Sequence, residues 1–95
     1  MSGEEVEISI NSITISLATS AAVHFGDVPE GLTGERQPPN LLAAKQMIDL
    51  LAVLESKTQG NLTPEEAQLL KDVLYELRLR FVKAATDEQK PLIVP

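Results

Sequence analysis

The stretch Thr63–Ala85, TPEEAQLLKDVLYELRLRFVKAA, contains the strongest local signal in the chain and decides the fold class. It opens with a capping box, in which the Thr63 hydroxyl bonds the amide of Glu66 and the Glu66 carboxylate reaches back to the Thr63 amide. Pro64 suits the first helical position, where a missing N–H costs nothing. Apolar residues then recur at helical spacing on one main face: Leu69, Leu70, Val73, Leu74, Leu77, Phe81, Ala84 and Ala85. We therefore predict a helix over residues 64–85.

The same helix carries a second apolar stripe. Tyr75, Leu79 and Val82 follow one another at i, i+4 and i+7, on the side away from the main face. A helix in a small bundle needs only one buried face. The second stripe therefore predicts a contact with another protein molecule.

The segment before Thr63 predicts a partner helix. Asn40 is a good N-cap for a helix over residues 41–58, and Gly60 ends it. One broad side of this helix is apolar: Ala43, Ala44, Met47, Ile48, Leu50, Leu51 and Leu54. The short loop 59–62 predicts that the two helices fold back on each other as an αα-hairpin.

Residues 8–25 contain no Asp, Glu, Lys or Arg, and two interpretations of their start are open. Alternation of β-branched residues over 6–17 is typical of two short strands about Asn11-Ser12. Helical spacing, a cap at Asn11 or Ser12 and the C-terminal Gly26 favour a helix over about 12–25. We favour the helix and expect it to lie between its own hairpin and another subunit, because an all-round uncharged helix is usually buried. The alternative is a weakly polar surface helix whose Ser and Thr residues face water.

These elements predict an all-α fold, a small three-helix protein with a central αα-hairpin that is expected to be oligomeric. Residues 1–11 are predicted to be an acidic disordered lead, 12–86 a single helical domain and 87–95 a flexible tail. The predicted interface residues combine the first helix with the second stripe: Ile13, Leu17, Phe25, Tyr75, Leu79 and Val82. We expect a homodimer or another homo-oligomer, with a different protein partner as an alternative.

Composition narrows the possible functions. The chain has 95 residues, a net charge of −6 and no Cys. A strong negative charge disfavours nucleic acid, which binds clustered Lys and Arg. Many Ser, Thr and Asn side chains within residues 8–25 disfavour a membrane span. Lack of Cys and an acidic start favour a cytoplasmic location.

Few residues are candidates for chemistry. His24, the single histidine, could act with Asp27 as a general base or metal ligand. Arg78 and Arg80, beside Tyr75, could hold an anionic ligand. We favour structural roles for all four polar candidates, His24, Asp27, Arg78 and Arg80, and assign no catalytic, cofactor-binding or metal-binding residue.

The first hypothesis for the function is thus a non-enzymatic, self-associating or protein-interaction module. The second is a small enzyme or ligand-binding protein that uses these four residues, and a third, weaker one is an acidic regulator of basic partners.

Four pieces of the chain, which together cover roughly residues 12–83, have a pattern in common with known proteins: SLATSAAVHFGD, LTGE, AAKQMIDLLAVLESKTQGNLTPEE and LLKDVLYELRLRFV. In these pieces the chain resembles the bacterial family known as domain of unknown function 1844. The insert RQPP is less typical of the family, and the tail lies outside the pattern. The resemblance implies a compact helical bacterial protein, supports the helix over 12–25 and implies no catalytic residues.

Overall fold

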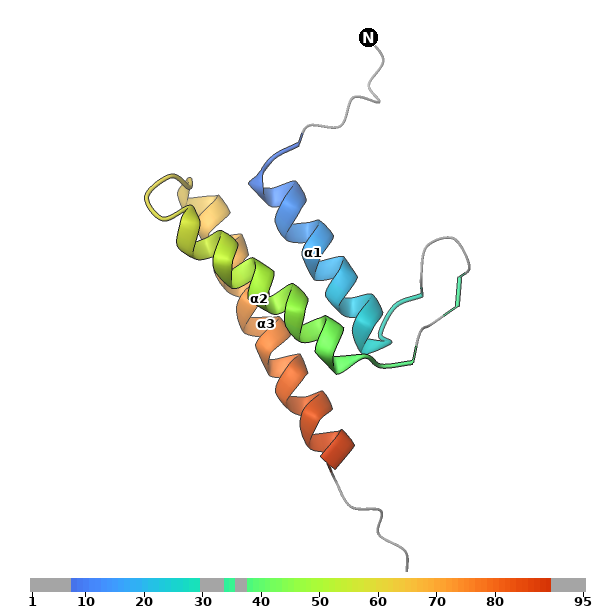
Figure 1. Cartoon of the computed structure of the whole chain (residues 1–95). Helices are drawn as coiled ribbons and strands as arrows, with labels where there is room; N and C mark the ends of the chain where they lie inside the picture. The colour runs from blue at the N-terminus through green and yellow to red at the C-terminus, as the bar shows by residue number, and fades with distance from the viewer. Residues whose placement is uncertain (1–7, 30–33, 36–37, 90–95) are drawn as a thin grey trace, which may run out of the picture.

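The computed structural model describes residues 8–29, 34–35 and 38–89, which form three helices (Figure 1). They are α1 (Ile10–Phe25), α2 (Leu41–Lys57) and α3 (Pro64–Gln89). No strand occurs in these residues, so the predicted all-α fold is confirmed. The alternative of two strands over 6–17 is wrong for residues 10–17, which are helical, and residues 6–7 lie outside the described part.

α1 begins two residues earlier than predicted, because a different residue caps it. The Ser9 side chain, rather than Asn11 or Ser12, accepts a hydrogen bond from the Ser12 N–H, at 3.3 Å. At the other end, Gly26 has φ 80°, a left-handed conformation that favours glycine. The N–H groups of Gly26 and Asp27 then donate to the last carbonyls of α1, each at 2.9 Å. α1 thus stops where the glycine predicts.

The caps of the hairpin helices follow the sequence closely. Asn40 Oδ1 accepts from the Ala43 N–H at 3.0 Å, and α2 ends at Lys57 with Thr58 as its C-cap. Both bonds of the capping box form: the Thr63 N–H donates to Glu66 Oε1 at 2.8 Å, and the Glu66 N–H donates to Thr63 Oγ1 at 3.1 Å. α3 continues four residues beyond the predicted end, to Gln89, because no Gly or Pro interrupts the chain between Pro64 and Pro91.

These bounds change the predicted layout at both ends. α1 begins inside the predicted lead of residues 1–11, and α3 ends inside the predicted tail of residues 87–95. Residues 1–7 and 90–95, on which the rest of those two predictions falls, lie outside the described part of the chain.

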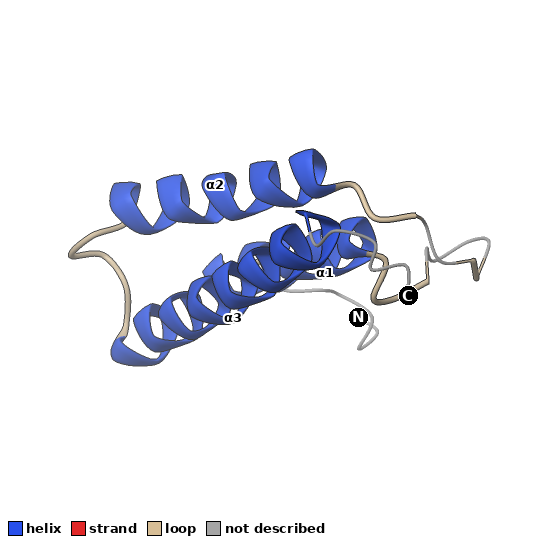
Figure 2. Cartoon of the chain, turned by 90° about the horizontal axis from the view of Figure 1, so that it is seen from below, coloured by secondary structure: helices blue, strands red, loops and turns tan. Residues whose placement is uncertain are grey.

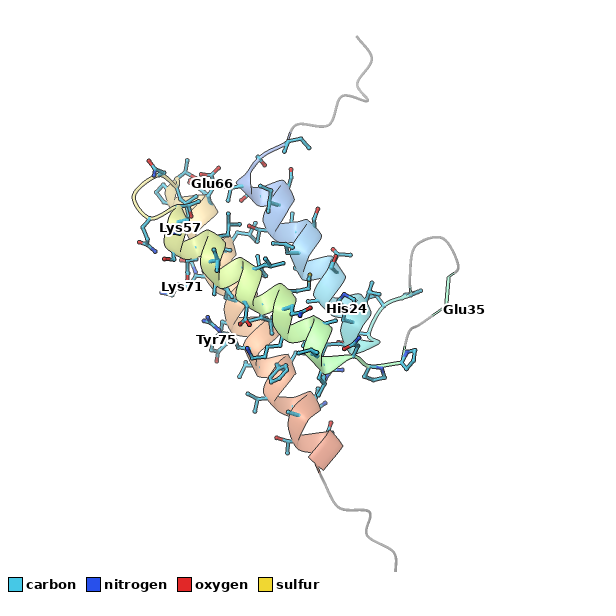
Figure 3. All side chains as sticks on the ribbon, viewed as in Figure 1. His24, Glu35, Lys57, Glu66, Lys71 and Tyr75 are labelled. Atoms are coloured by element: carbon cyan, nitrogen blue, oxygen red, sulfur yellow. The ribbon has the colours of Figure 1, made fainter. Side chains whose placement is uncertain are left out.

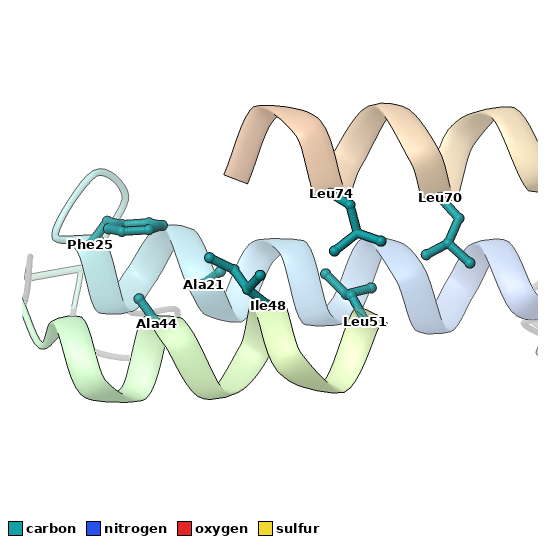
Figure 4. Close-up of a cluster of buried hydrophobic side chains, with 7 residues drawn as sticks. All are labelled: Ala21, Phe25, Ala44, Ile48, Leu51, Leu70 and Leu74. Carbon is teal, nitrogen blue, oxygen red and sulfur yellow. The ribbon is translucent and has the colours of Figure 1, made fainter. Parts of the chain in front are cut away.

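α2 and α3 form the predicted αα-hairpin, and α1 packs against both of them. The turn between α2 and α3 and the connection between α1 and α2 lie at opposite ends of the bundle (Figure 2). The core draws on all three helices (Figure 4): Ala21, Phe25, Ala44, Ile48, Leu51, Leu70 and Leu74. The fully buried alanines Ala21 and Ala44 leave room for the backbones of α1 and α2 to approach each other.

Two features of the described helices bear on function. Thr14 is the buried polar residue of α1, and its hydroxyl has no hydrogen-bond partner. Among the helices that the structure describes, none is long and apolar enough to cross a membrane.

Candidate functional site

Two of the four polar candidates bind each other. Arg80 Nε donates to Asp27 Oδ2 at 2.7 Å, and Arg80 Nη2 donates to Asp27 Oδ1 at 2.6 Å. The Arg80 guanidinium also lies 4.9 Å from the centroid of the Phe25 ring. The hydrogen bonds to the Asp27 carboxylate raise the pKa of Arg80 above its usual value. Arg80 therefore serves as a clamp between α3 and the residues that follow α1.

The other two polar candidates, His24 and Arg78, have different surroundings. His24 is half-buried in the last turn of α1, where its backbone carbonyl accepts a hydrogen bond from the Asn40 N–H at 2.7 Å. Arg78 is exposed and lines a groove on another side of α3. Figure 3 shows His24 on α1, away from Lys71 and Tyr75, which project from the opposite side of the bundle. Asp27 and Arg80 thus bind each other, whereas Arg78 lies in a groove that neither of them lines.

A protein metal site usually needs three or more ligating side chains close together. Among the side chains that the structure describes, no group of three or more His, Asp or Glu residues could hold a metal ion.

The exposed apolar feature of α3 is the second stripe, Tyr75, Leu79 and Val82, which we call the α3 stripe. These side chains are 62%, 51% and 61% exposed. The core residues Leu70 and Leu74 lie on the buried face of the same helix, and Leu74 borders the stripe. The α3 stripe therefore faces outward from the bundle, and the described chain leaves more than half of each of its side chains uncovered.

A groove of about 480 Å³ runs along the α3 stripe. Its lining combines the stripe with charged residues of α2 and α3: Glu55, Lys71, Asp72, Leu74, Tyr75, Arg78, Leu79 and Val82. An apolar centre with a charged margin is typical of a surface that contacts another protein.

Three charged residues that flank the α3 stripe, Lys71, Glu76 and Lys83, were missed as candidates in the sequence, whereas Arg78 was among the polar candidates. Asp72, Tyr75, Leu79, Val82 and Thr86 follow one another by alternating steps of three and four residues, the spacing of a coiled-coil seam. That spacing places Glu76 and Lys83 along one flank and Lys71 and Arg78 along the other. If the stripe had been extended to Asp72 and Thr86 in the sequence, the coiled-coil spacing would have identified the charged residues beside it.

The remaining predicted interface residues lie on α1 and differ in exposure. Ile13 is exposed, and Leu17 is half-buried against the core. Phe25 is 2% exposed and lies in the core of the single chain, beneath the Arg80 guanidinium. We therefore correct the predicted interface by removing Phe25, because it has no surface left to offer a partner.

A second exposed apolar region lies on α2. A shallow hollow of about 380 Å³ is lined by Gln46, Met47, Asp49, Leu50 and Val53. Asp49 in this lining accepts a hydrogen bond from Lys45 Nζ at 2.8 Å. A dry contact here would have to bury that ion pair, so the α2 hollow is less suited to an apolar contact than the α3 stripe.

Three helices around one small core, with an apolar stripe on the outside of the longest helix, define a small all-α protein with an interaction surface as its candidate site. The chain belongs to the family described as a domain of unknown function, DUF1844, whose model matches residues 7–83. The matched region contains α1, α2, the α3 stripe and Lys83. No curated protein and no solved structure matches the chain.

Proposed function

We propose that this protein is a non-enzymatic helical module that self-associates through the α3 stripe. The supporting observation is the half-to-two-thirds exposure of Tyr75, Leu79 and Val82 on a helix whose opposite face is already covered by the core. Contiguous apolar surface of this kind marks interaction sites.

Burial energies favour association. Removing apolar surface from water contributes about 25 cal/mol per Å². A 95-residue chain has a small core and a small margin of stability, so covering three more large side chains would add materially to it. A homodimer covers two stripes with one contact, and it needs no second gene product.

The second hypothesis, an enzyme or ligand-binding protein, is disfavoured by the contacts and positions of the four polar candidates. Asp27 and Arg80 bind each other through both hydrogen bonds of a bidentate pair. Arg78 lies on another side of α3, and His24 lies in α1. A ligand would have to displace Asp27 before it could make two parallel hydrogen bonds with the Nε and Nη2 groups of Arg80.

The proposed module would work in the cytoplasm. A chain without Cys cannot use the disulfides that an oxidising compartment offers to small domains.

Light scattering coupled to gel filtration over a concentration series tests the proposal. The expected mass of the wild-type chain rises above the 10.3 kDa of one copy as the concentration increases. The double substitution Tyr75→Ser, Leu79→Ser should hold the mass at one copy while circular dichroism stays helical. The matched control is Leu42→Ser, at an exposed leucine of α2, which should associate like the wild type. A wild-type mass of one copy at every concentration would contradict self-association, and equal loss in the control would move the contact away from the α3 stripe.

A further inference from the structure

The charges that flank the α3 stripe specify the orientation of a second copy. We propose that two copies of this chain pair through α3 in antiparallel orientation, with Glu76 of each copy opposite Lys83 of the other. This inference rests on the proposed function and adds the partner's identity, direction and register to it.

The seam is long enough to define a register. Asp72, Tyr75, Leu79, Val82 and Thr86 are all exposed and share one face of α3 by their steps of three and four residues. Tyr75, Leu79 and Val82 form the apolar centre, and the polar residues Asp72 and Thr86 stand at the two ends. Helices that present such a seam to each other pack with nearly parallel axes, either in the same or in opposite directions.

A parallel pair would be penalised at the seam and would gain nothing at its flanks. Equivalent residues of the two copies would meet, so the Asp72 carboxylates would be placed against each other in the contact. On the flanks, residues five positions apart would face each other, so the repulsion between Arg78 and Lys83 would offset the attraction between Lys71 and Glu76. The like charges in the seam therefore oppose this orientation, and the flanks do not compensate for them.

An antiparallel pair centred between Arg80 and Phe81 removes both conflicts. Leu79 of each copy then faces Val82 of the other, and Tyr75 faces Thr86, so that every large apolar residue of the stripe is covered. Glu76 of each copy lies beside Lys83 of the other, which gives opposite charges twice. In antiparallel seams the residues of the same flank meet, and this is why Glu76 pairs with Lys83 rather than with Lys71.

Neighbouring antiparallel registers are worse. A shift that centres the pair near Leu77 would set Asp72 against Val82 and bring the two Glu76 carboxylates together. A shift that centres it near Ala84 would bring the two Lys83 side chains together. A single register thus satisfies both the apolar centre and the flank.

The flanking charges are available for this contact. Glu76 and Lys83 are exposed, and neither takes part in an ion pair within the described residues. Their pairing between copies also opposes the repulsion between two chains that each have a net charge of −6.

Disulfide formation tests the orientation directly, because the chain has no cysteine of its own. Tyr75→Cys and Thr86→Cys are prepared separately, with tags of different mass, and oxidised alone and as a mixture. In the proposed pair, residue 75 of one copy faces residue 86 of the other. The two copies of either residue are 11 positions apart along the seam, about 16 Å, and a disulfide needs Cα atoms within about 7 Å. The expected result is a disulfide-linked heterodimer in the mixture and little product from either variant alone. Thr19→Cys, on the exposed side of α1, measures the background of random encounters.

Charge exchange tests the register. Glu76→Lys and Lys83→Glu should each raise the dissociation constant of the homodimer by about tenfold, because two attractive contacts become repulsive. Mixing the two variants should restore dimers, and so should combining both substitutions in one chain. Both substituted positions are exposed, and retained helicity by circular dichroism confirms that each variant is folded.

The failures can be told apart. A wild-type chain that stays at one copy in the concentration series ends the proposed function and this inference together. A dimer in which Tyr75→Cys links to itself overturns the antiparallel orientation alone. A dimer that gives no product above the Thr19→Cys background places the contact elsewhere and leaves self-association standing. A dimer that ignores both charge substitutions overturns the proposed pairing of Glu76 with Lys83.

Discussion

The Arg80 guanidinium of α3 donates two hydrogen bonds, of 2.6 and 2.7 Å, to the Asp27 carboxylate, which lies 53 residues earlier in the chain. The pair fixes the residues after α1 against α3, and the guanidinium lies over the Phe25 ring at the edge of the core. Both side chains are partly in water, with 33% of Arg80 and 40% of Asp27 exposed. Solvent therefore screens the attraction, and the clamp stabilises the fold modestly.

Removing this clamp should lower the free energy of unfolding by a measurable amount. We expect Arg80→Ala to cost about 1–2 kcal/mol, because it removes the ion pair and the contact over the Phe25 ring. Arg80→Lys keeps the charge but cannot make two parallel hydrogen bonds, so it should cost about half as much. Urea unfolding of Arg80→Ala, Asp27→Ala and the double variant gives their coupling energy. The Lys45–Asp49 pair, more than half exposed on α2, is the control and should couple more weakly. No coupling between Asp27 and Arg80 would contradict the clamp.

The buried Thr14 hydroxyl should destabilise the fold. Thr14 is fully buried and its Oγ1 has no hydrogen-bond partner among the described residues, so the hydroxyl lost its contacts with water on folding and gained none from these residues. Thr14→Val keeps the shape and replaces the hydroxyl by a methyl group, and we expect it to raise the free energy of unfolding by about 1 kcal/mol or more. Thr19→Val on the exposed side of α1 is the matched control and should change it little. A destabilised Thr14→Val variant would mean that the hydroxyl is hydrogen-bonded in solution.

Adjacent leucines of α2 offer a test of the core. Leu51 is fully buried, whereas Leu50 is 49% exposed. Leu51→Ala should cost about 2–5 kcal/mol, since it loses transfer energy and leaves a cavity among three helices. Leu50→Ala changes the same side chain on the same helix and should cost less than about 1 kcal/mol. Thermal unfolding of both variants at one protein concentration makes the comparison. An equal loss of stability in the two variants would contradict the burial of Leu51 and the exposure of Leu50.

Local signals were sufficient to predict most of the fold. The Thr63–Glu66 capping box, the Asn40 cap and the stop at Gly26 each involve residues within four positions of one another, so their chemistry can be predicted from the printed sequence. The apolar spacing of α3 likewise contained both its buried face and its exposed stripe.

Contacts between distant residues could not be predicted in the same way. Glu76 stands at the favourable distance for an ion pair with Arg80 along the helix, yet Arg80 binds Asp27, which the packing of α1 brings within reach. Phe25 was expected to face another subunit, but the same packing places it in the core. Thr14 was one of several hydroxyl residues in α1, and only the positions of α2 and α3 determine which of them loses water.

Because the helices differ in length, protection from hydrogen exchange is expected to differ along α3. α3 has 26 residues and α2 has 17, lengths of about 39 and 26 Å, so the final turns of α3 extend past the start of α2 (Figure 1). Backbone amides in those turns can exchange their hydrogens when the end of the helix frays. Amides around Leu70 and Leu74 exchange only when the whole domain unfolds. α3 is therefore one continuous helix whose two halves differ in protection from hydrogen exchange. A bound molecule that touches its C-terminal end would slow deuterium uptake there first.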